Sequence, residues 1–245
     1  MDCGKTRRLT RLFGKDGKCL VVAMDHAGFM DKVLPGLAKP VETIRAVAGA
    51  GADAFLLTLG SARLAASVLG RAGVWLSVDA QSPLLDRIVE TALRIGADGV
   101  KCMVYPGGDA QSQSITHLAA LAAECARWGM PLMAEVIPGG FAAGSEMRTP
   151  EKIAAGARIA MEAGADVIKT FYTGDPASFR TIVGYCPVPL VVLGGERVKT
   201  DAELLDNVCN AMAAGAAGVA IGRNIWQHPA PAEITARLVA LVHSC

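Results

Sequence analysis

The sequence has almost no net charge. Of its 245 residues, 24 are Lys or Arg and 23 are Asp or Glu, which gives a formal net charge of +1. This balance offers no general attraction for nucleic acid or for an anionic membrane surface, so we expect neither as a partner. An anionic ligand would need a local binding site instead.

Long hydrophobic runs are also lacking, although 52% of the residues are hydrophobic and only 5% aromatic. No run approaches the roughly 20 apolar residues that a membrane helix needs, so we expect no membrane span. The basic, polar segment 1–18 is expected to lead into the first strand and not to be a signal peptide. We expect the many small apolar residues to form a large core and a homo-oligomer interface.

Patterned cysteines and metal ligands are missing. The seven cysteines include no Cys-x-x-Cys pair, and this scatter is typical of reduced thiols in the cytoplasm. The four histidines lack the spacing of a metal site. We therefore expect a cytoplasmic protein without a metal or another cofactor, in which chemistry at a carbonyl group would depend on an amine.

A tetrapeptide recurs just ahead of four short apolar runs. It reads Ala-Gly-Ala-Asp at 50–53, Ile-Gly-Ala-Asp at 95–98, Ala-Gly-Ala-Asp at 163–166 and Ala-Gly-Ala-Ala at 214–217. Each copy follows an amphipathic helical pattern, and glycine at a helix end before a buried strand is typical of an αβ connection. The distance between successive copies accommodates two strand–helix units, which predicts eight units in all.

Eight β-prone segments alternate with helical patterns. Strands are expected at 19–24, 54–57, 74–77, 99–104, 131–136, 167–170, 189–193 and 218–221, and helices, for example, at 41–48, 85–95, 115–128, 150–163, 202–214 and 232–243. This alternation predicts a parallel sheet, and the chain length favours a single-domain (β/α)8 TIM barrel over 1–245. An open doubly wound sheet is the alternative, but no Gly-x-Gly-x-x-Gly motif follows the first strand.

Two lysines occupy equivalent positions at strand ends. Lys101 and Lys169 each lie three residues beyond the aspartate of their repeat copy, where the other copies have Leu56 and Ala220. Because Leu56 and Ala220 are apolar, we expect side chains at this position of a strand to point into the barrel. Burial and a second cation both lower the pKa of an amine, and a free amine can attack a ketone. Alternatively, the aliphatic part of each lysine side chain is buried and its ammonium group reaches solvent.

Two carboxylates and a histidine complete the candidate catalytic groups. Glu135 lies in an apolar strand, where an unpaired carboxylate is costly, so the inward lysines are its expected partners. It can shuttle protons or form a purely structural ion pair. Asp25 follows the first strand and can orient or deprotonate a substrate hydroxyl, whereas His26 is expected to be a hydrogen-bonded wall residue.

Two glycine-containing loops follow the last two strands. Gly194 and Gly195 follow the seventh, and Gly222 and Arg223 follow the eighth. In this fold these loops commonly bind phosphate, because glycine lets backbone N–H groups approach the anion and arginine adds a cation. We expect these four residues to bind the anionic group of a substrate; plain turns are the alternative.

Together these segments resemble the DhnA-type class I aldolase family, which includes archaeal-type fructose-bisphosphate aldolases and the autoinducer-2 phosphate processing enzyme. The resemblance spans nearly the whole chain and is most specific at 24–26, 166–170, 193–195 and 221–227. It implies that Lys169 forms the Schiff base, that Asp25 assists proton transfer, and that 194–195 and 222–223 are the phosphate loops.

Two positions depart from this family. Ala27 stands where the family usually has glycine, and Ile137 matches the tyrosine acid/base of archaeal-type fructose-bisphosphate aldolases. The missing tyrosine disfavours fructose bisphosphate as the substrate. The combination of Lys101 with Glu135 instead resembles tagatose-bisphosphate and sulfofructose-phosphate aldolases.

We therefore predict a Schiff-base aldolase that cleaves or forms a carbon–carbon bond in a small phosphorylated or otherwise anionic keto-sugar or keto-acid. Lys169 would add to the ketone, Glu135 and Lys101 would shuttle protons, and Asp25 would remove the hydroxyl proton. The alternatives are a non-cleaving acyl- or ketol-transferase and a metabolite-sensing barrel without turnover. The loops expected to select the substrate are 79–84, 105–114 and 139–148.

Overall fold

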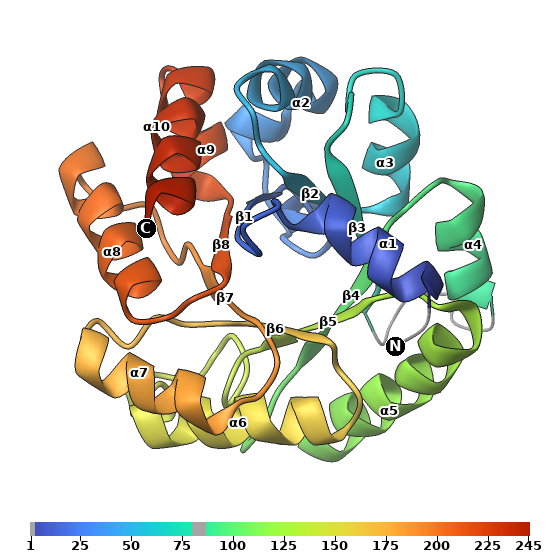
Figure 1. The fold of residues 1–245 in the computed structure, drawn as a ribbon, viewed down its shortest axis with the longest axis vertical. Coiled ribbons are helices and arrows are strands. Elements are labelled where there is room, and N and C mark those ends of the chain that lie inside the picture. Colours follow the sequence, from blue (N-terminus) through green and yellow to red (C-terminus); the bar gives the residue numbers. More distant parts are fainter. Residues whose placement is uncertain (1–2, 80–86) are drawn as a thin grey trace.

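Eight parallel strands close into a barrel in the computed structural model, which describes residues 3–79 and 87–245 (Figure 1). Each strand pairs with the next, and β8 pairs with β1. The strands are β1 (Cys19–Ala23), β2 (Ala54–Leu57), β3 (Gly73–Ser77), β4 (Gly99–Val104), β5 (Leu132–Val136), β6 (Val167–Thr170), β7 (Leu190–Leu193) and β8 (Gly218–Ile221). The predicted (β/α)8 barrel is confirmed, and no predicted strand end is wrong by more than one residue.

Helices surround the barrel (Figure 1). They are α2 (Pro40–Gly49), α3 (Leu59–Ala65), α4 (Ile88–Arg94), α5 (Gln111–Trp128), α6 (Pro150–Glu162), α7 (Pro176–Tyr185), α8 (Asp201–Ala213), α9 (Arg223–Trp226) and α10 (Pro231–Ser244), with short 3-10 turns η1 (His26–Gly28), η2 (Pro35–Leu37) and η4 (Ser145–Met147). Residues 85 and 86 of the helix predicted at 85–95 lie outside the described residues. Within the described ranges, no helix is long and apolar enough to cross a membrane.

The segment before β1 leads into the first strand, as expected, and most of it forms a helix that was not predicted. This helix, α1 (Cys3–Leu12), lies against β3 and β4 at one end of the barrel (Figure 1). Its last residue, Leu12, is fully buried and belongs to the apolar cluster inside the barrel. A polar, basic helix with one buried apolar end is stabilised by that anchoring and not by its own pattern, which is why the sequence did not indicate it.

Apolar side chains form two separate clusters. The larger one lies between the strands and the surrounding helices. The smaller one fills the barrel interior and includes Leu56, Ala220 and the fully buried Trp75. Leu56 and Ala220 therefore face inward, as the repeat predicted. A Cβ atom on Gly99 would lie 2.3 Å from the Trp75 ring, so this glycine makes the room that the indole needs.

The aspartates of the repeat tie neighbouring strands together at the N-terminal end of the barrel. In each case one residue of the preceding strand exchanges two hydrogen bonds with the aspartate, because its N–H donates to the carboxylate and its carbonyl accepts from the aspartate N–H. The pairs are Leu20 with Asp53, Val74 with Asp98, and Leu132 with Asp166, at N–H to carboxylate distances of 2.7, 3.2 and 2.9 Å. In the fourth copy, Ala217 keeps only the backbone bond to Leu190.

Each of these aspartates also binds a cationic or titratable group from a chain end. The contacts are Asp53 with His243 at 3.0 Å, Asp98 with Arg11 at 2.9 Å, and Asp166 with Lys5 at 2.9 Å. Helices α1 and α10 are thus attached to the barrel through the repeat. The recurring aspartate has a structural role at the end of the barrel opposite to the candidate site.

Candidate active site

Lys101, Glu135 and Lys169 lie on three adjacent strands. Glu135 pairs with Lys169 across β5 and β6, and Met133 pairs with Lys101 across β4 and β5. Met133 belongs to the cluster inside the barrel, and side chains two residues apart on a strand point to the same face. Glu135 and its two lysine neighbours therefore face inward, as predicted, above the apolar floor of the barrel.

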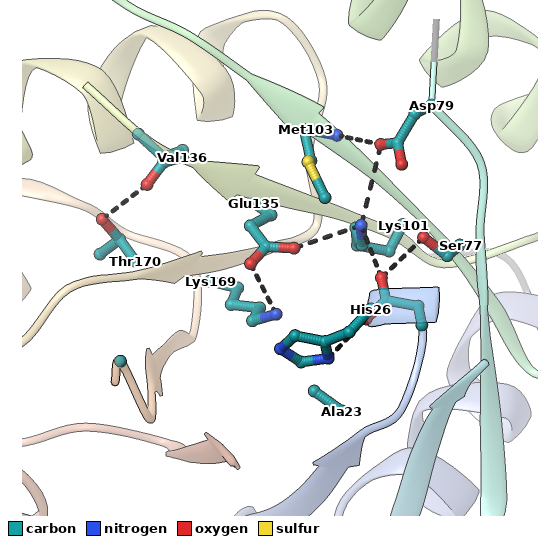
Figure 2. Close-up of polar contacts among 12 residues, drawn as sticks. Ala23, His26, Ser77, Asp79, Lys101, Met103, Glu135, Val136, Lys169 and Thr170 are labelled. Carbon is teal, nitrogen blue, oxygen red and sulfur yellow. Dashed lines mark hydrogen bonds and ion pairs between the residues drawn. The ribbon is translucent and has the colours of Figure 1, made fainter. Parts of the chain in front are cut away.

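These side chains form a continuous set of ion pairs (Figure 2). Glu135 lies between the two lysines, with Oε1 2.6 Å from Lys169 Nζ and Oε2 3.2 Å from Lys101 Nζ. Asp25 Oδ2 lies 3.0 Å from Lys101 Nζ, and Asp79 Oδ1 lies 3.7 Å from it. Lys101 is fully buried, and Asp25, Lys169 and Glu135 are only 1%, 4% and 7% exposed. Close pairing offsets the large cost of burying these charges.

Carboxylates dominate the surroundings of Lys101. Burial alone would lower its pKa, but Asp25, Glu135 and Asp79 together raise the pKa of Lys101 well above its ordinary value. The predicted depression of the amine pKa is therefore wrong for Lys101, because three carboxylates outweigh one neighbouring lysine. Burial would likewise raise the carboxyl pKa values, yet the two lysines hold the pKa of Asp25 and of Glu135 below its ordinary value.

Asp25 is held from two sides directly after β1. The Ser77 hydroxyl donates to Asp25 Oδ2 at 2.8 Å, and Lys101 contacts the same oxygen. His26, the next residue, lines the cavity with its ring edge against Trp226. Its Nδ1 is buried 3.8 Å from Asp25 Oδ1 and has no hydrogen-bond partner among the described residues, contrary to the expected hydrogen-bonded wall residue. Burial lowers the pKa of His26 despite the nearby carboxylate.

The two glycine loops are joined by side chains from α9. Arg223 Nη2 donates to the Gly195 carbonyl at 2.8 Å. Asn224 is buried and donates to the carbonyls of Gly194 and Glu196, both at 3.1 Å. The structure therefore brings the predicted anion-binding residues together, and it adds Asn224 as the residue that fixes one loop to the other.

A cavity of about 410 Å³ contains most of the predicted site residues. Its wall includes Asp25, Glu135, Lys169, Gly194, Gly195, Gly222 and Arg223. Lys101 does not line it, because it lies behind the Glu135 carboxylate. Within the described ranges, the lining residues come from β1, β5, β6, β7 and β8 and the loops after them, so the cavity occupies one half of the barrel mouth.

Several further lining residues were not singled out from the sequence. Among them are Phe29, Phe141, Arg148 and Phe171. Phe141 and Arg148 lie in the loop 139–148, which was expected to select the substrate. No repeating hydrophobic pattern in this loop indicates that their side chains point into the cavity. Of the loop expected at 79–84, only Asp79 belongs to the described residues. Residues 3–79 and 87–245 contain no group of three His, Cys, Asp or Glu side chains placed to hold a metal ion.

The similarity of this chain to known proteins agrees with the geometry of the site. A family model described as DeoC/LacD family aldolase matches residues 19–228. The chain belongs to this family. The predicted resemblance to DhnA-type class I aldolases is confirmed.

Relatives of this DeoC/LacD aldolase cover nearly its full length. The 2-amino-3,7-dideoxy-D-threo-hept-6-ulosonate synthase of Halobacterium salinarum is 37% identical over 99% of this chain and 92% of its own length. A solved Schiff-base-forming fructose-1,6-bisphosphate aldolase is 32% identical over 97% of this chain and 99% of its own, with a TM-score of 0.83. A solved archaeal fructose-1,6-bisphosphate aldolase, with its catalytic lysine bound to the carbinolamine intermediate, is 30% identical over 98% and 99%, with a TM-score of 0.84.

These matches put the present DeoC/LacD aldolase among the class I aldolases, which are lyases that act through a Schiff base. In this aldolase Ile137 is buried and lines the cavity beyond the end of β5. An aliphatic side chain cannot donate or accept a proton. Any acid/base work on this side of the cavity therefore needs another group, and Glu135 is the carboxylate that β5 provides.

Proposed function

We propose that Lys169 forms a Schiff base with the ketone of a small phosphorylated keto-sugar or keto-acid, and that the enzyme then breaks or forms the adjacent carbon–carbon bond. The observation that carries this proposal is the contact of 2.6 Å between Lys169 Nζ and Glu135 Oε1 inside the cavity. Such a contact gives the lysine a direct partner for proton transfer.

Glu135 handles the protons of Schiff-base formation. The Lys169 ammonium gives a proton to Glu135, and the free amine attacks the carbonyl carbon. One proton moves from the attacking nitrogen to the former carbonyl oxygen, which gives the neutral carbinolamine. Glu135 then gives its proton to the carbinolamine hydroxyl, which leaves as water, and a cationic imine remains. Lys101 keeps its own proton, because its pKa is raised by three carboxylates, and acts by holding Asp25 and Glu135 in place.

Asp25 accepts the proton that initiates cleavage. It takes the proton from the hydroxyl on the β-carbon, the bond between the α- and β-carbons breaks, and its electron pair moves to the imine nitrogen. An aldehyde leaves, and the enamine is protonated at carbon and hydrolysed. The lowered pKa of Asp25 keeps it ionised at neutral pH, and the Ser77 hydroxyl and Lys101 fix its orientation.

The phosphate of the ketone is placed between the loops after β7 and β8. Gly194, Gly195 and Gly222 offer backbone close to the cavity, and Arg223 adds a cation held against the Gly195 carbonyl. A phosphate there puts the carbonyl of a three-carbon ketone within reach of Lys169 on the neighbouring strand β6.

Borohydride reduction with dihydroxyacetone phosphate, followed by peptide mapping, tests the proposal. We expect one adduct, on Lys169, in the wild-type protein and none in Lys169→Met. Lys152→Met, at an exposed lysine on α6, should leave the adduct unchanged. An adduct on another lysine, or none across a panel of phosphorylated ketones, contradicts the proposed role of Lys169.

We also propose that the protein works as a homo-oligomer in the cytoplasm. Large apolar side chains are exposed on the outer helices, among them Trp128 at the end of α5 and Tyr185 at the end of α7. The exposed free thiols of Cys3, Cys209 and Cys245 are compatible with a reducing compartment. Light scattering on the purified chain should give a mass above 25.4 kDa.

A further inference from the structure

His26 is a titratable group of the cavity that the proposed steps do not use. It directly follows Asp25, lines the cavity, and packs edge-on against Trp226 with ring centroids 5.4 Å apart. A Cβ atom on Gly222 would lie 2.6 Å from His26 Cε1, so the imidazole also lies against the loop after β8. These contacts fix the ring between Asp25 and the proposed phosphate site.

The two ring nitrogens of His26 have different surroundings (Figure 2). Nδ1 is buried, lies 3.8 Å from Asp25 Oδ1 and has no hydrogen-bond partner in the described part of the chain. Nε2 is the nitrogen on the side of the ring that is nearer to Lys169 in this view. An Nδ1–H group beside a carboxylate would form a hydrogen bond of about 2.7–2.9 Å. The longer distance therefore indicates the tautomer in which Nδ1 has a lone pair and Nε2 carries the proton.

The imidazole is neutral at neutral pH. Burial lowers the pKa of His26, and the cations Lys169 and Arg223 lower it further, although Asp25 and Glu135 act in the opposite direction. A neutral imidazole has one N–H group and one lone pair on opposite sides of the ring. It can therefore accept a proton on one side while it donates another proton on the other side.

The two oxygens of Asp25 are also in different surroundings. Ser77 and Lys101 both contact Oδ2, at 2.8 and 3.0 Å, whereas Oδ1 faces His26 Nδ1. The proton that Asp25 takes from the substrate hydroxyl is therefore placed on Oδ1. A carboxylic acid with this proton is a hydrogen-bond donor, and Nδ1 with its lone pair is the matching acceptor.

The neighbouring acid groups have no proton to give at this stage. Glu135 has given its proton to the departing water, and Lys101 keeps its own because Asp25, Glu135 and Asp79 raise its pKa. The enamine carbon nevertheless needs a proton, and Asp25 must lose one before the next turnover. A group that links Asp25 with the reacting carbon meets both needs.

We infer that His26 is a catalytic residue that protonates the enamine carbon after the carbon–carbon bond has broken. The inference rests on the proposed function, which supplies the enamine on Lys169 and the proton on Asp25. Asp25 gives its proton to Nδ1 while Nε2–H gives its proton to the α-carbon. The electron pair of the carbon–carbon double bond forms the new C–H bond, the nitrogen becomes a cationic imine, and Asp25 is ionised again.

His26 must then return to its first tautomer. Water that enters the cavity as products leave gives a proton to Nε2, and the proton on Nδ1 returns to water through Asp25. No net proton is gained or lost by the protein, and the hydroxyl proton of the substrate is replaced in effect by the new C–H bond.

Hydrogen exchange at the ketone tests this step without any aldehyde. In reverse, the step removes a hydrogen from the α-carbon of the bound ketone, so proton NMR in D2O can follow its replacement by deuterium in dihydroxyacetone phosphate. We expect exchange with the wild-type protein and a rate lower by about 10²- to 10⁴-fold in His26→Gln, because an amide cannot pass a proton through itself. Exchange at the wild-type rate would mean that Asp25 acts on the carbon directly, and it would overturn the inference.

Two further variants separate proton transfer from packing. His26→Phe keeps a ring against Trp226 and Gly222 but has no nitrogen, so we expect the same loss of exchange as in His26→Gln. His228→Gln is the matched control, because His228 bonds to Asp201 at 3.1 Å and does not line the cavity. It should exchange at the wild-type rate. Wild-type exchange in His26→Phe would show that only the ring shape matters and would contradict the inference.

The tautomer of His26 can be measured in the free protein. Nitrogen NMR of protein with 15N-labelled histidines distinguishes a protonated from an unprotonated ring nitrogen, and the signals of His26 are those missing from His26→Gln. We expect a protonated Nε2 and an unprotonated Nδ1 at pH 7.5. A protonated Nδ1 would mean that this nitrogen cannot accept the proton of Asp25, and it would overturn the inference.

Borohydride trapping distinguishes failure of this inference from failure of the proposed function. His26→Gln and His26→Phe keep Lys169 and Glu135, so both should still give the adduct on Lys169 with dihydroxyacetone phosphate. An intact adduct together with wild-type exchange in His26→Gln rejects the role of His26 alone. Absence of both the adduct and the exchange from the wild-type protein rejects the proposed function.

Discussion

Glu135 Oε1 lies 2.6 Å from Lys169 Nζ, and the two residues are direct register partners on β5 and β6. Strand pairing therefore sets this contact, and neither residue depends on a flexible loop for its position. A catalytic amine and its proton acceptor held in this way are oriented before substrate binds, which removes part of the entropic cost of the reaction.

Glu135→Gln should slow turnover because the amide cannot carry the proton between Lys169 and the carbinolamine oxygen. We expect kcat to fall about 10²- to 10⁴-fold, the range for loss of a general acid/base. The adduct on Lys169 should still form, but more slowly, in time-resolved borohydride trapping. Glu124→Gln, on the outer surface of α5, is the control. Wild-type rates in Glu135→Gln would show that the contact is only structural.

Lys101→Met should destabilise the protein, because it leaves Asp25 and Glu135 buried without their shared cation. Removing one partner of a buried ion pair costs about 3–5 kcal/mol, which urea unfolding at pH 7.5 would measure. In the wild type, the lowered pKa values of Asp25 and Glu135 stabilise the fold above their unfolded pKa values, and this contribution is lost as the pH falls.

The pH dependence of Lys101→Met should have the opposite sign. Without Lys101, Asp25 loses the largest cause that lowers its pKa and burial raises that pKa, whereas Glu135 keeps Lys169, so acid should recover part of the lost stability through Asp25. The difference in unfolding free energy between wild type and variant should therefore be smaller at pH 5 than at pH 7.5. An equal difference at both values would mean that the carboxylates do not titrate in this range.

Gly222→Ala should disturb the proposed phosphate site more than Gly195→Ala does. A Cβ atom on Gly222 would lie 2.6 Å from His26 Cε1 and 2.7 Å from the Ala23 carbonyl oxygen, so the loop must move. Misplacement of about 1 Å can cost about 10²-fold in rate, and we expect a loss of that order in kcat/KM for phosphorylated ketones. At Gly195 no atom lies within 4 Å of the new Cβ, but φ is +60°. A residue with a side chain is destabilised by about 1–2 kcal/mol in this left-handed conformation.

The control for both glycine substitutions is Gly60→Ala, which changes a glycine of α3 with no atom within 4 Å of the new Cβ. Activity measured over a range of ketone concentrations separates the effect on KM from that on kcat. If Gly222→Ala lowers kcat and leaves KM unchanged, the loop does not bind the phosphate.

His243→Gln should flatten the pH dependence of thermal stability. Burial opposes the charge on His243, but Asp16 at 2.8 Å and Asp53 at 3.0 Å raise its pKa above the ordinary value. This contribution is fully present below about pH 6.5, the ordinary histidine pKa, and is lost as the pH rises through the folded-state value. The melting temperature of the wild type, relative to the variant, should therefore fall between pH 5.5 and 8.5. A constant difference contradicts the ion pair.

The alternation of side chains along each strand explains what could be predicted of this site. The repeat places Lys101 and Lys169 in the phase of Leu56 and Ala220, so their inward orientation follows from the alternation of side chains along a strand. The protonation state of Lys101 could not be obtained in this way. It depends on Asp25, which follows β1 and is not on a strand next to β4, and on Asp79, which lies just beyond β3 in a loop without a periodic pattern.

Loops and chain ends account for what could not be predicted. Phe141 and Arg148 lie between β5 and α6. This loop has no repeating hydrophobic pattern from which to predict the side chains that point inward. Helix α1 has a polar sequence and is held by contacts of Lys5, Arg11 and Leu12 with the barrel. In both cases tertiary contacts decide the local structure, and a single sequence carries little record of them.

The aspartates of the repeat have a consequence for how this enzyme can change. They fasten neighbouring strands and both terminal helices at one end of the barrel, while the charged cluster and the stacked rings of Phe29 and Phe141 lie at the other. A random library confined to 139–148 would therefore leave every one of these fastenings untouched. Acceptance of new aldehydes can evolve there at little risk to folding, so the architecture separates tolerance to mutation from choice of substrate.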